Sequence, residues 1–96
     1  MNNKKRKTDC SIARAKRFGE YVRRKVCEHK LSICDFESRA KISQGSIQSY
    51  KTGREPSFFN FLKVIDWIAR YENRNEDDVF MEAIKAMRGR DENIII

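Results

Sequence analysis

The side chains best suited to chemistry in this 96-residue chain are amides and hydroxyls gathered between residues 43 and 54. Gln44 can donate one hydrogen bond and accept another, and the major-groove edge of adenine offers the matching acceptor and donor. Ser46 and Ser49 can bind bases or phosphates, Gly45 permits close approach, and Gln48 either reaches a base or faces solvent. The predicted base-contacting residues are therefore Gln44, Gly45, Ser46, Gln48 and Ser49.

Phosphate-binding side chains flank this cluster. Ser32 opens an expected helix, where free backbone N–H groups add to its hydroxyl. The full set of expected backbone-contacting residues is Ser32, Ser43, Lys51, Thr52 and Arg54. A basic run near the start of the chain, Lys4, Lys5, Arg6 and Lys7, is expected to contact DNA from a disordered arm over residues 1–10.

The net charge of +7 is distributed unevenly along the chain. Residues 1–17 carry a net charge of +6, residues 18–57 carry +3, and residues 58–96 carry −2. A polyanion should therefore approach the arm and the segment that contains the amides. The alternative is a solubilising tail, which the contrast between the two halves makes less attractive.

Catalysis and metal binding have little support in this sequence. His29 is the one histidine, and Cys10, Cys27 and Cys34 lack the paired spacing of a zinc site or a disulfide framework. There is no glycine-rich phosphate loop and no spacing of a nucleophile with a base. We expect no enzyme activity, no catalytic residue, no metal and no cofactor. No apolar run approaches the roughly 18 residues of a membrane helix, so we expect no membrane partner and a cytoplasmic, nucleoid-associated location.

Helical spacing dominates the rest of the chain and predicts an all-α fold of five helices. Ile12, Phe18, Val22 and Val26 recur at helical steps and predict a first helix from about residue 11. Ser32, Ser43, Ser57 and Asn75 are suitable N-caps for the four helices that follow. The expected ranges are about 32–40 for helix two, 43–52 for the reader helix and 76–88 for helix five, within a domain of residues 11–89 that is followed by a tail of residues 90–96.

The fifth expected helix carries an apolar stripe, Phe80, Ile84 and Met87. A single DNA-reading unit covers few base pairs, so useful specificity requires two copies. We therefore predict that this stripe forms a dimer interface while it also completes the core. Trp67 and the terminal Ile94–Ile96 are further candidates for such a surface.

Taken together, these features resemble the lambda-repressor-like (Xre/Cro-type) helix-turn-helix family of bacterial and phage regulators. The resemblance covers about residues 18–70 and rests on Leu31-Ser32, Ile42-Ser43, Ile47, Gly53, Pro56 and the run from Leu62 to Ile68. It implies a five-helix domain whose third helix enters the major groove. The basic arm and the fifth helix look most like those of members whose arm wraps DNA and whose fifth helix pairs two subunits.

Several positions depart from the family pattern. Ile33 stands where the family usually has a glutamine that contacts phosphate and braces the first glutamine of the reader helix. Lys41 replaces the usual glycine of the turn, so we expect either a less regular turn or some backbone strain there. Val26 and Lys51 replace a frequent arginine–glutamate pair, which leaves Lys51 available for a phosphate.

The leading hypothesis is a sequence-specific regulator of transcription that binds double-stranded DNA. It would be a phage or mobile-element repressor that occupies a palindromic operator as a homodimer. An antitoxin or a restriction–modification controller would use the same fold, with a toxin as partner in the first case. A protein antirepressor is a further candidate partner. The third hypothesis is a protein-interaction module that does not bind DNA.

Overall fold

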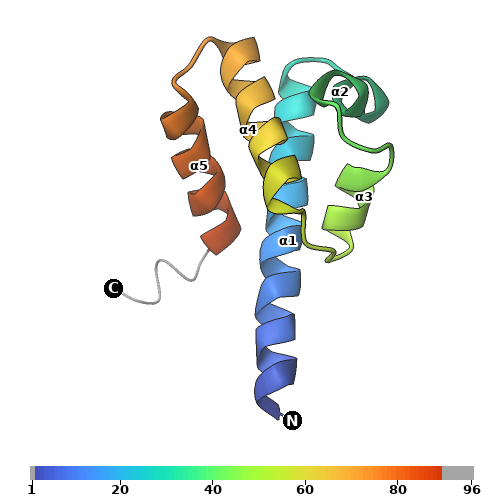
Figure 1. Ribbon diagram of the computed structural model, residues 1–96, viewed down its shortest axis with the longest axis vertical. Helices are drawn as coiled ribbons and strands as arrows, with labels where there is room; N and C mark the ends of the chain where they lie inside the picture. The colour runs from blue at the N-terminus through green and yellow to red at the C-terminus, as the bar shows by residue number, and fades with distance from the viewer. Residues whose placement is uncertain (1, 90–96) are drawn as a thin grey trace.

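The computed structural model describes the backbone of residues 2–89 and the side chains of residues 11–89. All regular structure in this part of the chain is helical. Figure 1 shows α1 running through the centre, with α2 and α3 on one side of it and α5 on the other. None of these helices is both long and apolar enough to cross a membrane. The helices are α1 (Asn2–Glu28), α2 (Ile33–Ala40), α3 (Ser46–Lys51), α4 (Phe58–Glu72) and α5 (Glu76–Arg88).

One face of α1 supplies the centre of the hydrophobic core. Phe18, Val22 and Val26 are buried there, as their spacing predicts. The ring of Phe18 packs against Tyr50 of α3 and Phe61 of α4, with ring centroids 5.7 and 5.0 Å apart. A single aromatic side chain thus connects three helices.

The start of α1 differs from the prediction. The sequence predicted a disordered arm over residues 1–10, but the helix begins at Asn2. This segment contains no proline or glycine, and lysine and arginine favour helix, so these residues extend a helix that packing already holds further along. The lack of an apolar pattern misled the prediction. The predicted arm side chains Lys4, Lys5, Arg6 and Lys7 lie outside the described side chains, and Met1 and residues 90–96 lie outside the described residues altogether.

Three helix starts are fixed by the capping side chains that the sequence indicated. In each case a side-chain oxygen accepts a hydrogen bond from a backbone N–H in the first turn, which would otherwise have no partner. The caps are Ser32 to the N–H of Asp35 at 3.0 Å, Ser57 to Asn60 at 3.1 Å, and Asn75 to Asp77 at 2.8 Å.

The stripe that α5 buries lies one residue away from the predicted one. Val79 and Ala83 are fully buried. Phe80 and Ile84 are half-buried at the edge of the core. Small side chains at 79 and 83 let α5 approach α1 and α4, and the larger neighbours remain partly exposed.

An ionic cluster joins the end of α1 to α4 and α5. Lys25 lies 3.1 Å from Glu72 and 3.2 Å from Glu82, and the hydroxyl of Tyr21 donates to Glu82 at 2.6 Å. Arg74 donates to Glu72 at 2.8 Å and to Glu82 at 3.2 Å. Burial favours a neutral Glu82, but hydrogen bonds from Tyr21, Arg74 and Lys25 outweigh it and lower the pKa of Glu82 to about 2. Burial and the bond to Glu82 together raise the pKa of Tyr21.

Candidate nucleic-acid interface

A buried carboxylate holds the turn between α2 and α3. Glu37 of α2 has an exposed fraction of only 2%. One of its oxygens accepts the backbone N–H of Gly45 and the other accepts that of Ile47, both at 3.0 Å. Because these N–H groups precede or begin α3, they lack helical acceptors of their own. Glu37 therefore fixes the position of α3 relative to α2, a role that was not predicted from the sequence.

The backbone of the turn differs from the expected form. The sequence predicted a third helix over about 43–52 with Ser43 as its cap, but α3 covers only Ser46–Lys51. Gly45 precedes it with a φ of 90°, a conformation that suits glycine. Ser43 is not the cap of α3, whose start has no capping side chain. Glu37 instead accepts the N–H of Gly45, one of the two groups that a cap at Ser43 could have bound. Lys41 ends α2 with a φ of 64°, which confirms the expected strain.

The short helix α3 is anchored on one side and open on the other. Ile47 and Tyr50 have exposed fractions of 1% and 3%, as their spacing predicts. Gln48, which lies between them on the helix, therefore faces outward. Of the base-contacting candidates, Gln44, Gly45 and Gln48 are exposed, and Ser46 and Ser49 are half-buried.

A shallow hollow between α3 and the start of α4 brings most of the predicted residues together. Ser43, Gln44, Gly45, Ser46, Ser49 and Arg54 all line it. Gln48, Lys51 and Thr52 are not among its lining residues. Ser57 and Asn60 of α4 line it as well; the sequence indicated Ser57 only as a helix cap and gave no reason to choose Asn60.

The hydroxyls differ in whether a hydrogen remains for a phosphate. Ser32 accepts a backbone N–H of α2, so its own hydrogen is left to donate. The hydroxyl of Thr52 donates to the carbonyl of Ser49 at 2.8 Å, and that of Ser46 donates to the carbonyl of Ser43 at 2.5 Å. Thr52 and Ser46 must break these internal bonds before they can donate to DNA.

The helices α1 and α3 approach each other closely at Gly19. A Cβ atom at this residue would lie 2.8 Å from both the backbone nitrogen and the Cγ of Lys51. The two helices therefore meet almost backbone to backbone, a contact that only glycine permits. Lys51 is half-buried by this packing, whereas Arg54 is exposed. Arg54 is thus the better placed of the two for a phosphate.

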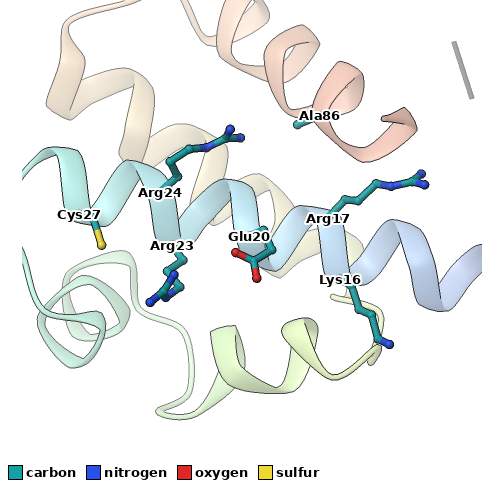
Figure 2. A pocket seen from close by; sticks show the side chains of 7 residues that line it. All are labelled: Lys16, Arg17, Glu20, Arg23, Arg24, Cys27 and Ala86. Atoms are coloured by element: carbon teal, nitrogen blue, oxygen red, sulfur yellow. The ribbon is translucent and has the colours of Figure 1, made fainter. Parts of the chain in front are cut away.

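A basic groove runs along the exposed side of α1. Lys16, Arg17, Arg23 and Arg24 line it, with Glu20, Cys27 and Ala86. Figure 2 shows Lys16 and Arg23 extending toward α3, while Arg17 and Arg24 extend toward α5. The guanidinium of Arg17 donates to the carbonyls of Met87 and Arg88 at 3.0 and 2.9 Å, at the end of α5. Lys16 and Arg23 therefore add positive charge beside the predicted reading surface.

The predicted dimer residues form part of an apolar hollow at the junction of α1, α4 and α5. Phe80, Ile84 and Met87 line it together with Phe58 and Phe61. The ring of Phe80 packs edge-on against that of Phe61, with centroids 5.5 Å apart. Phe58 is 66% exposed. These side chains thus contact the core and also present apolar surface to solvent.

Trp67, another predicted candidate, occupies a different place. Its ring packs edge-on against Phe36 of α2 at 4.9 Å and stacks on Tyr71 at 4.7 Å between centroids. It lines a hollow with residues of α2. The Ile94–Ile96 segment lies outside the described residues.

Among the described residues, no group of three or more histidine, cysteine, aspartate or glutamate side chains is arranged to hold a metal ion. No protein-family model, no curated protein and no solved structure matches the chain.

Proposed function

We propose that this protein is a sequence-specific double-stranded DNA-binding regulator of transcription with a lambda-repressor-like fold. The observation that carries the proposal is the α2–turn–α3 unit, which Glu37 fixes internally while it leaves Gln44 and Gln48 exposed. A rigid helix with outward amides and hydroxyls matches what major-groove reading requires.

Gln44 is the principal reading residue in this proposal. Its amide pairs with the N6 and N7 positions of adenine, a contact worth about 1–3 kcal/mol of discrimination against other bases. Ser46 and Ser49 line the same hollow and contact neighbouring bases or phosphates. Gly45 adopts the positive φ that the turn requires. Because it has no side chain, it leaves room beside Gln44 for a base in the major groove.

Phosphate contacts set affinity and register in this proposal. Ser32 donates its free hydroxyl hydrogen at the start of α2, and Arg54, which lines the hollow, binds a second phosphate. Lys16 and Arg23 extend the positive surface along α1. The arm cations, which now belong to a helix that begins at Asn2, add affinity that does not depend on sequence.

We further propose that two copies bind a palindromic operator through the apolar hollow of α5. Phe80, Ile84 and Met87 supply the apolar contact, and Phe58 extends it. Paired copies place two reading units on half-sites about one helical turn apart. Occupation of such an operator blocks polymerase, so the protein acts as a repressor of the phage or mobile-element type, located with the nucleoid.

Selection of duplexes from a random library by the purified protein tests this proposal. The expected result is an enriched inverted repeat with half-sites about one turn apart. Gln44→Ala should relax the preference at one symmetric position, because only the amide reads that base. Arg54→Ala should weaken binding to all sequences alike and reduce the salt dependence by about one phosphate contact.

The outcome that overturns the proposal is a library that shows no enrichment at low or moderate salt. Gln48→Ala is the comparison variant for Gln44→Ala, since Gln48 is also an exposed amide of this unit but lies outside the hollow that gathers the other candidates. Equal loss of selectivity in both variants would refute the leading role of Gln44.

One observation favours a second candidate function, an antitoxin or interaction module that holds a protein partner. Phe58 and Phe59 are 66% and 74% exposed, and their rings contact each other. Adjacent exposed aromatics are typical of protein-binding surfaces. If Phe59→Ser abolishes capture of a partner while DNA selection stays unchanged, both functions operate on separate surfaces.

A further inference from the structure

The amide of Gln44 is tethered to a sulfur atom. Its Nε2 donates a hydrogen bond to the Sγ of Cys34 at 3.3 Å. Cys34 lies in the first turn of α2, and Gln44 lies in the turn that precedes α3. Both side chains are exposed, so this contact joins α2 to the turn before α3 at the protein surface.

The tether determines what the amide can still bind. A glutamine side chain has two N–H donors and one carbonyl acceptor. Once one N–H is bound to Cys34, a single donor and a single acceptor remain. Adenine offers an acceptor at N7 and a donor at N6, whereas guanine offers acceptors at both N7 and O6. The tethered amide complements adenine and lacks the second donor that guanine requires.

We propose that Cys34 is a positioning residue that makes Gln44 select adenine over guanine. The inference rests on the proposed function, because it requires Gln44 to meet a base pair. Cys34 itself touches no base. It acts by occupying one N–H of the amide and by reducing the number of orientations that the exposed side chain adopts before DNA arrives.

Competition binding with two duplexes tests this role. One duplex carries the selected site, and the other carries G·C in place of A·T at the position that Gln44→Ala relaxes. The measured quantity is the ratio of the two dissociation constants. Cys34→Ala should reduce this ratio by roughly threefold to tenfold, the range that the loss of one modest hydrogen bond produces. Cys34→Ser should restore most of it, since a hydroxyl oxygen also accepts from the amide.

Cys27→Ala is the matched control. Cys27 is also an exposed free thiol, but it lies on α1 and does not bind Gln44, whose amide is bound by Cys34. Any effect of Cys27 on phosphate contacts would act on both duplexes alike, so its loss should leave the ratio unchanged. Thermal unfolding of each variant shows whether the fold is retained. A purely structural role of Cys34 would weaken binding to both duplexes equally and leave the ratio intact.

The outcomes separate this inference from the proposed function. If the wild-type protein selects no sequence, the proposed function fails and this inference fails with it. If the wild-type selects adenine and Cys34→Ala keeps the same ratio, the function stands and the role of Cys34 is refuted. A serine variant that behaves like the alanine variant would equally refute the hydrogen bond as the cause.

Discussion

Replacing Glu37 by glutamine should destabilise the protein out of proportion to the small chemical change. The wild-type carboxylate accepts the N–H groups of Gly45 and Ile47, each at 3.0 Å. A glutamine of the same shape keeps one acceptor oxygen and turns an NH₂ group toward the other N–H. One hydrogen bond is therefore replaced by two donors that face each other in a buried place.

The expected magnitude follows from these contacts. A hydrogen bond to a charged group contributes about 1.5–3 kcal/mol, and a buried donor without a partner costs about 1–3 kcal/mol. Since these two terms describe partly the same loss, Glu37→Gln should lower the free energy of unfolding by about 2–4 kcal/mol. That is a large share of the roughly 5–15 kcal/mol typical of a domain.

Urea unfolding followed by far-UV circular dichroism at neutral pH measures this loss. Glu28→Gln is the matched control because Glu28 is an exposed carboxylate at the end of α1, and its variant should stay within about 0.5 kcal/mol of the wild type. If the two variants have the same stability, Glu37 does not hold the turn, and α3 is not fixed relative to α2 by this carboxylate.

Three further predictions concern other parts of the fold. Gly19→Ala should lower the free energy of unfolding by about 1–2 kcal/mol in the same urea assay, because the new methyl group would lie 2.8 Å from the backbone of Lys51; a gain in stability would contradict this contact. Lys41→Gly should raise the free energy of unfolding by about 0.5–1 kcal/mol, since glycine tolerates the φ of 64°. Lys41→Ala should show no gain in stability. Glu82 has its pKa lowered from 4.5 to about 2, so the unfolded chain binds its proton first as the pH falls. Stability should therefore decline between about pH 4.5 and pH 2, and Glu82→Gln should flatten the decline measured by urea unfolding at several pH values; an unchanged slope would show that this carboxylate is not the cause.

The sequence predicted well those features that depend on near neighbours in the chain. The caps Ser32, Ser57 and Asn75 bind an N–H two or three residues away, so the residue types alone indicate them. The orientation of α3 was equally local, because burial of Ile47 and Tyr50 leaves Gln48 on the exposed side of the helix.

Features that depend on distant residues were not predicted. The start of α3 depends on Glu37, which lies outside the helix, so a serine at residue 43 looked like a cap. The contact of Gly19 with Lys51 exists only once α1 and α3 are packed together. On α5, spacing could not distinguish the stripe of Val79 from that of Phe80, because the two differ by one residue and the neighbouring helices decide between them.

Within the candidate site, residue types were easier to predict than their partners. Amides and hydroxyls near residue 44 indicated hydrogen bonding, and most of these residues line one hollow. The contact between Gln44 and Cys34 was not foreseen, because a cysteine on α2 gives no sequence signal of its own. A contact between a residue of α2 and a residue of the following turn can be predicted from the sequence only when the geometry of that turn is known.

The most direct test of the central claim is an NMR titration of the ¹⁵N-labelled protein with duplex DNA at low salt. If the α2–turn–α3 unit binds DNA, the largest amide shift changes should fall at Ser32 and between residues 43 and 54, with smaller changes along the basic side of α1. Shift changes confined to the aromatic residues Phe58 and Phe59 of α4 and Phe80 of α5, or no changes at all, would contradict DNA binding by this unit.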